Sequence, residues 1–132
     1  VIRGTIVPFL KMLQKYPEYE QEVKVPEKVW PLRIWYMYDQ DVCTLIDVNE
    51  RERKVKIKNY TDKIMFRAFG VMEEPDYNQY IEFLESRCFP ESRDKMKLIL
   101  KDLGLPFYDP IMIIEKTEGR MAEDDFWIRI ER

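Results

Sequence analysis

Alternating apolar and polar residues in the first half of the chain predict three β-strands. The segments are Leu32 to Tyr38, Val42 to Val48 and Arg53 to Lys58. The first is rich in aromatic and β-branched residues, and the third alternates Val55 and Ile57 with lysines, a pattern typical of a half-buried strand. A short charged connection, Asn49 to Glu52, joins the last two strands and indicates a hairpin.

The middle segment lacks the polar face of a surface strand. Val42, Ile46 and Val48 fall on one face of it, and Cys43 and Leu45 fall on the other. We therefore expect this strand to be covered on both faces.

Helical spacing replaces the strand pattern after Pro75. Asp76 is a good N-cap, and Gln79 is its capping-box partner, at the start of a helix that runs to about Cys88. Pro90 is expected to open the next helix, which Gly104 ends as its C-cap.

The remaining elements lie near the two ends of the chain. Asp109 followed by Pro110 marks a further helix start, and Gly119 stops that helix. Residues 126–131 alternate as a half-buried strand, with Phe126, Ile128 and Ile130 opposite Trp127, Arg129 and Glu131. Near the start, Thr5 to Tyr16 has helical spacing.

This order of elements predicts an α+β fold. We expect a single domain, residues 1–132, with a small antiparallel sheet of three or four strands packed with about four helices. The segment Asn59 to Met72 is compatible with either a strand or a short helix.

Composition excludes several kinds of site. The 132 residues contain no histidine and only four glycines, so neither a histidine-dependent catalytic site nor a glycine-rich phosphate loop is expected. The 22 basic and 25 acidic residues give a net charge of −3, which argues against nucleic-acid binding by the whole surface. We expect no enzyme activity, no catalytic residues, no metal and no cofactor.

The cysteines and the hydropathy pattern point to a cytoplasmic protein. Cys43 and Cys88 are far apart in sequence and are interpreted as two buried free thiols in a reducing compartment. No apolar run approaches the roughly 20 residues of a membrane span, and no segment resembles a signal peptide. We therefore expect no contact with a membrane.

Two carboxylates near the predicted hairpin suggest one enzymatic alternative, a metal-dependent nuclease. Asp47 ends one strand, and Glu52 and Lys54 begin the next, which resembles the Mg²⁺-binding acids and lysine of restriction-type nucleases. A solvated hairpin tip explains the same residues and is the favoured interpretation.

Basic residues raise a nucleic-acid alternative. Arg53, Lys54, Lys56 and Lys58 concentrate positive charge on the third strand, where alternate side chains lie about 7 Å apart on one face. Lysines on an edge strand also prevent it from pairing with other chains, so the pattern has a structural explanation as well.

A tryptophan on the polar face of the last strand raises a third possibility. Trp127 either packs beneath another element or anchors a protein partner. Asp125 lies two residues earlier, in an acidic turn with Glu123 and Asp124, and it could alternatively cap backbone amides or pair with an arginine.

The second half of the chain also shares scattered residues with a known family. They are Phe83, Leu84, Arg87, Pro90, Arg93, Leu103, Gly104, Leu105, Thr117, Gly119, Asp125, Trp127 and Ile128. This combination resembles a short domain found beside or ahead of HipA-like serine/threonine kinases of Gram-positive bacteria, over roughly residues 76–130. In that family, a helix ending in R-x-x-P-x-x-R leads to a leucine-glycine turn and a closing D-x-W-I strand.

The resemblance implies an accessory module that binds a protein, because the kinase itself is absent from this chain. It also implies a bacterial toxin–antitoxin or mobile-element setting, and the whole chain is similar to small hypothetical proteins carried on mobile elements of Firmicutes. Arg87 and Arg93 then either make charged contacts with the partner protein or form internal ion pairs with the acidic turn.

The favoured function is a non-enzymatic binding or regulatory module that acts through a protein partner. Its candidate partner-binding residues are Arg87, Arg93, Asp125 and Trp127. The alternatives are a nucleic-acid-binding accessory protein using Arg53, Lys54, Lys56 and Lys58, and a small phage- or plasmid-encoded inhibitor of the anti-defence type. A metal-dependent nuclease is the least favoured.

Overall fold

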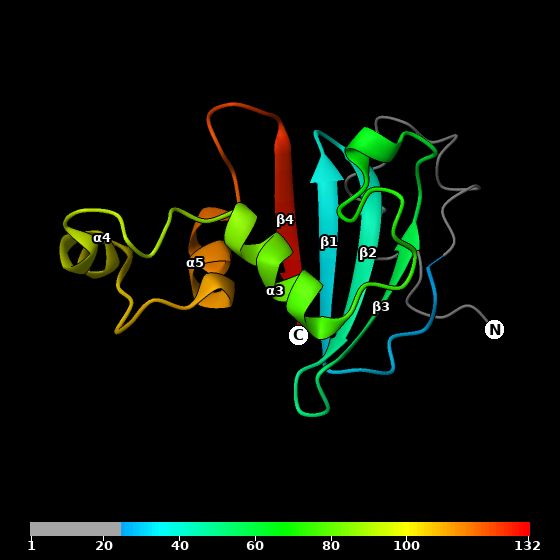
Figure 1. The fold of residues 1–132 in the computed structure, drawn as a ribbon, viewed down its shortest axis with the longest axis horizontal. Coiled ribbons are helices and arrows are strands. Elements are labelled where there is room, and N and C mark those ends of the chain that lie inside the picture. The colour runs from blue at the N-terminus through cyan, green and yellow to red at the C-terminus, as the bar shows by residue number, and fades with distance from the viewer. Residues whose placement is uncertain (1–24) are drawn as a thin grey trace.

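Four antiparallel strands form one sheet within residues 25–132, the part of the chain that this computed structural model describes. They are β1 (Leu32–Tyr38), β2 (Asp41–Asn49), β3 (Lys54–Asn59) and β4 (Phe126–Glu131), in the order β3-β2-β1-β4 (Figure 1). The last strand therefore returns to pair with the first. The helix predicted over Thr5 to Tyr16 lies outside the described residues.

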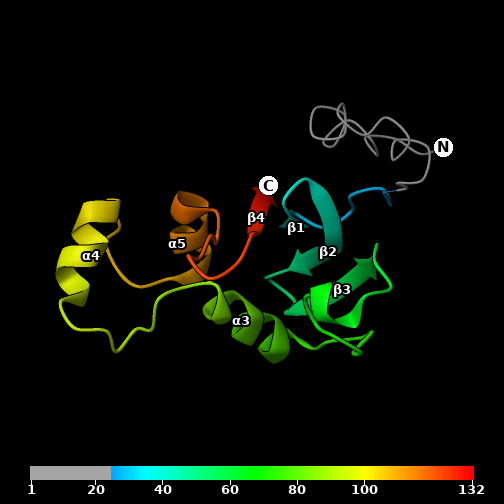
Figure 2. The ribbon, with the colours of Figure 1, turned by 90° about the horizontal axis from the view of Figure 1, so that it is seen from above.

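Three α-helices and one 3₁₀ helix accompany the sheet. They are η1 (Ile64–Phe66), α3 (Tyr77–Ser86), α4 (Met96–Leu103) and α5 (Pro110–Thr117). Figures 1 and 2 show α3 and η1 on the same face of the sheet and α4 at the end of the molecule farthest from β3. The fold is α+β, as predicted, and the unassigned segment after β3 contains a short 3₁₀ helix.

The main apolar core lies between the sheet and α3. Ile34 of β1, Ile46 of β2 and Ile128 of β4 are buried there together with Tyr80 and Leu84 of α3. Burying apolar surface contributes about 25 cal/mol per Å² and is the main force that holds the helix on the sheet.

A second apolar cluster confirms that β2 is covered on both faces. Its buried members are Val25, Trp35, Met37, Val42 and Leu45. The register pairs Trp35 with Leu45 and Met37 with Val42, so these side chains share the face opposite α3.

The predicted faces of β2 are wrong at its first residues. Val42 belongs to the second cluster, apart from Ile46 and Val48, whereas Cys43 belongs to the main core. The cause is a β-bulge. Tyr36 pairs with Thr44 while Met37 pairs with Val42, so Cys43 is an extra residue that exchanges the two faces.

The end of α4 is as predicted, but its start is not. Gly104 is the left-handed C-cap of this helix, as expected, but Pro90 does not open it. The amide of Arg93 donates to the Pro90 carbonyl at 3.0 Å in a turn, and Lys95 at φ 60° interrupts any helical run before Met96.

The predicted capping box of α3 is present. The Asp76 carboxylate accepts from the Gln79 amide, and the Gln79 side chain accepts from the Asp76 amide, both at 2.8 Å. These bonds satisfy two amide donors at the helix start that the helix itself leaves unpaired.

Replacing Asp76 should therefore destabilise the fold through α3. We expect Asp76→Ala to lower the free energy of unfolding by about 1 kcal/mol, measured by urea denaturation. Asp94→Ala is the control, because Asp94 is exposed and its side chain makes no hydrogen bond with residues 25–132. Equal effects of the two substitutions would contradict the capping account.

Candidate partner-binding cleft

A cleft of about 420 Å³ lies between the end of α3 and the connection from α5 to β4. Its walls are largely apolar and its polar groups are mainly arginines. The lining residues are Arg87, Cys88, Phe89, Pro90, Arg93, Ile113, Thr117, Arg120, Met121, Ala122 and Glu123.

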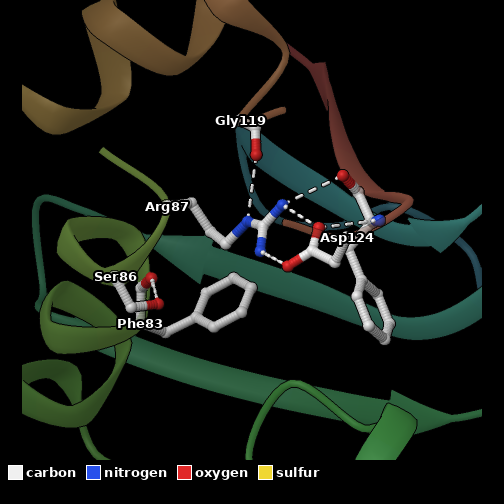
Figure 3. A network of polar contacts seen from close by, with 6 residues as sticks. Phe83, Ser86, Arg87, Gly119 and Asp124 are labelled. Carbon is white, nitrogen blue, oxygen red and sulfur yellow. Dashed lines mark hydrogen bonds and ion pairs between the residues drawn. The ribbon is translucent and has the colours of Figure 1, made fainter. Parts of the chain in front are cut away.

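Arg87, the C-cap of α3, fixes one wall of this cleft. Its Nε donates to the Gly119 carbonyl at 2.9 Å, and its Nη1 and Nη2 form a bidentate pair with the Asp124 carboxylate at 2.9 and 3.0 Å (Figure 3). Nη2 also donates to the Phe126 carbonyl at 2.9 Å. One guanidinium thus ties the end of α3 to the chain on both sides of the α5–β4 connection.

Gly119 is required where the chain leaves α5. Its φ is +62°, and a Cβ atom there would lie 3.1 Å from Cδ1 of Ile128. Directly before it, the Glu118 carbonyl accepts from the amide of Ile128 at 2.7 Å. A residue without a side chain lets the connection approach β4 this closely.

The same network sets the electrostatics around the cleft. The hydrogen bonds from the Arg87 side chain hold the pKa of the Asp124 carboxyl below its usual value, against the opposing effect of burial. Burial raises the pKa of the Cys88 thiol to about 12, with smaller contributions from Glu85 and Asp109. Cys88 is therefore protonated at neutral pH, and it does not supply a nucleophilic thiolate.

The rim of the cleft carries two accessible cations. Arg93 is exposed, and its side chain forms no ion pair with residues 25–132. Arg120 pairs with Glu118 at 2.8 Å, but both side chains are more than half exposed, at 56% and 54%, so this pair is weak. The Arg120 guanidinium also lies 5.0 Å from the centre of the Trp127 ring.

The structure brings only some of the four predicted partner-binding residues together. Arg87 and Arg93 both line the cleft, but Arg87 is 7% exposed and its donors are used internally, which favours the structural alternative for this residue. Its acidic partner is Asp124. The exposed neighbour Asp125 instead uses its carbonyl to accept from the amide of Asp39 at 3.1 Å.

Trp127 is half-buried at the edge of the second apolar cluster. Its Nε1 donates to the Asp39 carbonyl at 2.6 Å, so the indole is held in place. Trp127 does not line the cleft itself, but it contacts Arg120, which does. No motif or spacing in the sequence identified Arg120 or Met121, because only the folded connection brings them opposite Phe89 and Arg93.

The predicted basic face is present on β3 but does not include Arg53. Lys54, Lys56 and Lys58 are exposed on one side of the strand. Lys56 lies 4.7 Å from the Trp30 ring and Lys58 lies 5.2 Å from the Tyr60 ring. The Arg53 guanidinium instead stacks on Tyr77 of α3 at 4.7 Å, on the opposite face of the sheet.

The groups of the nuclease alternative are engaged with other side chains. Both carboxylate oxygens of Asp47 accept from Arg33, at 2.7 and 3.0 Å, in a buried pair. Glu52 pairs with Lys54 at 3.2 Å in the exposed turn. Across residues 25–132, no group of three or more acidic or cysteine side chains is placed to hold a metal ion.

Comparison of the chain with protein-family models, curated proteins and solved structures finds no significant match. The resemblance of residues 76–130 to the kinase-associated domain therefore stays a prediction. None of the helices within residues 25–132 is long and apolar enough to cross a membrane.

The Arg87–Asp124 pair should make the stability of the fold depend on pH. Because the folded-state pKa of Asp124 is lowered, the pair stabilises fully above the unfolded pKa of about 3.9 and loses its effect as pH falls through the folded value. We expect the wild-type protein to lose more unfolding free energy between pH 7 and pH 3 than Asp124→Asn does.

Chemical denaturation at both pH values measures this difference. Asp94→Asn is the matched control and should keep the wild-type dependence, because the exposed Asp94 carboxylate has no partner among residues 25–132. The same pH dependence in wild type and Asp124→Asn would show that the ion pair contributes nothing to stability.

Proposed function

We propose that this chain is a protein-binding module whose partner inserts an acidic, partly apolar segment into the cleft beside Arg93. The observation that carries the proposal is an exposed arginine without an ion-pair partner in residues 25–132, at the rim of a largely apolar cleft. An acidic side chain of a partner would neutralise Arg93.

The apolar wall defines the rest of the expected segment. Phe89 and Met121 line the cleft together with the arginines, and its volume of about 420 Å³ lies within the range of about 300–1,000 Å³ typical of binding pockets. Methionine and phenylalanine are common in binding surfaces because they give large contact area, and methionine adapts its shape. One or two apolar side chains next to the acid would fill this space.

The internal bonding of Arg87 supports a preformed site. It links the two walls of the cleft through one guanidinium, so the partner need not order them on binding. In this proposal Arg87 is a positioning residue and Arg93 and Arg120 make the contacts. A role in a toxin–antitoxin or mobile-element system belongs to the same proposal and rests on the sequence resemblance alone.

Nucleic-acid binding through β3 is the second candidate. It is favoured by three exposed lysines on one strand face, two of them beside aromatic rings. Binding through these lysines would weaken steeply as the salt concentration rises, because each phosphate contact releases counterions.

Selection from a random peptide library displayed on phage tests the partner chemistry. We expect wild-type protein to enrich peptides with aspartate or glutamate beside apolar residues. Arg93→Glu should lower the affinity for the selected peptides by about tenfold, or about 1.4 kcal/mol, because it places like charges together. Arg51→Glu, which reverses an exposed charge in the β2–β3 turn, should leave binding unchanged.

Met121→Asp tests the apolar wall in the same assay and should also weaken binding, while circular dichroism confirms that each variant is folded. Peptides without acidic residues, or equal binding by Arg93→Glu and wild type, would contradict the proposal. Recovery of nucleic acid alone by the tagged full chain, lost in Lys56→Glu, would instead support the second candidate.

A further inference from the structure

A second cavity of about 420 Å³ lies between α3 and the start of α5. It shares no lining residue with the cleft beside Arg93. Its lining combines tyrosines, carboxylates and apolar side chains: Glu50, Tyr77, Tyr80, Ile81, Leu84, Glu85, Glu91, Tyr108, Asp109, Pro110 and Ile111.

Three tyrosines give this cavity aromatic walls. The rings of Tyr77 and Tyr80 lie 5.4 Å apart in a tilted arrangement on α3. Tyr108, which precedes α5, donates its hydroxyl to the Phe89 carbonyl at 2.8 Å, which fixes its ring. Aromatic faces attract cations through the ring quadrupole.

The charged lining residues are all acidic. Glu50, Glu85, Glu91 and Asp109 contribute carboxylates, and no lysine or arginine lines the cavity. Asp109 is engaged as the N-cap of α5, but the other three side chains form no ion pair with residues 25–132.

Two arginines lie near the cavity and offset part of this charge, since Arg132 interacts electrostatically with Glu50 and Tyr80. Arg53 stacks on the Tyr77 ring at 4.7 Å, and Arg132 pairs with Glu115 at 3.1 Å. The four carboxylates outnumber these two arginines, so the cavity keeps an excess of negative charge beside aromatic surface, which together favour a cation.

A buried hydroxyl gives independent evidence for a polar occupant. Tyr80 is completely buried, and its hydroxyl has no hydrogen-bond partner among residues 25–132. Burial raises the pKa of this phenol. Glu50 and Asp109, which line the cavity, raise it further, and Arg132 opposes them. A buried hydroxyl without a partner is unfavourable, and a ligand that donates to its oxygen would relieve that cost.

We propose that this cavity binds an organic cation bearing N–H groups, namely an alkylammonium or a guanidinium. The tyrosines that line the cavity surround the cation, the carboxylates of Glu50, Glu85 and Glu91 neutralise it, and an N–H group donates to the Tyr80 hydroxyl oxygen. A free polyamine and a lysine or arginine side chain of a peptide share this chemistry.

The placement of the carboxylates favours an organic cation over a metal ion. Hard cations require several oxygen ligands at 2.0 to about 2.6 Å. No three acidic side chains within residues 25–132 come together closely enough to hold a metal ion. Carboxylates spread around an aromatic cavity suit a larger cation with dispersed N–H donors.

Isothermal titration calorimetry with spermidine, methylguanidinium and a lysine-containing tetrapeptide amide tests this site. We expect at least one of these cations to bind with one-to-one stoichiometry. Glu50→Gln and Glu91→Gln should each weaken binding at least about threefold, the size of a partly exposed charge contact. Glu73→Gln removes the same charge from an exposed position outside the cavity and should have no effect.

Tyr80→Phe separates the ligand contact from folding. It removes only the unpartnered hydroxyl, so the melting temperature without ligand should stay the same or rise, while affinity for the N–H cations falls. Tetramethylammonium, which has no N–H group, should bind wild type and Tyr80→Phe equally.

The titrations also identify the source of the cation. Tighter binding of spermidine than of the peptide indicates a free polyamine, and the reverse indicates a basic side chain. Absence of binding by all three N–H cations, or equal weakening by Glu73→Gln and Glu50→Gln, would overturn the proposal. Neither result bears on the Arg93 cleft, which is tested with acidic peptides.

Discussion

The guanidinium of Arg87 is the interaction on which the second half of the fold depends. It connects the last turn of α3 to the carbonyls of Gly119 and Phe126 and to the carboxylate of Asp124. Because Arg87 is almost fully buried, removal of its acidic partner leaves its charge uncompensated and destabilises the fold. The same contacts join the end of α3 to the connection that leads into β4, while β4 itself pairs with β1 through the sheet.

Both candidate sites lie where α3 meets α5 and the connection from α5 to β4. One end of α3 carries Arg87 and the basic, apolar cleft, while other residues of α3 and the start of α5 line the acidic, aromatic cavity. The two sites have opposite charge and separate linings. A single helix therefore presents one surface suited to acidic segments and another suited to organic cations.

The sequence predicted the elements well where local patterns decide them. The alternation of Val55 and Ile57 with lysines, the capping box at Asp76 and the C-cap at Gly104 all depend on neighbouring residues, and all are present in the structure. The faces of β2 were wrong because the bulge at Cys43 arises from pairing with β1. The start of α4 was wrong because Pro90 suits a turn as well as a helix start.

The candidate site was only partly predictable. Arg93 was found, but the role of Arg87 was open and its partner Asp124 was not identified, since their contact joins residues 37 positions apart. The central claim is that Arg87 holds the α5–β4 connection in the shape of the cleft. Native-state hydrogen exchange of Arg87→Lys, which keeps the charge but loses the bidentate geometry, tests it most directly. We expect protection to fall at the amides of Phe126 and Ile128 while the β1–β2 amides keep wild-type protection relative to global unfolding. Unchanged protection at Phe126 and Ile128 would contradict the claim.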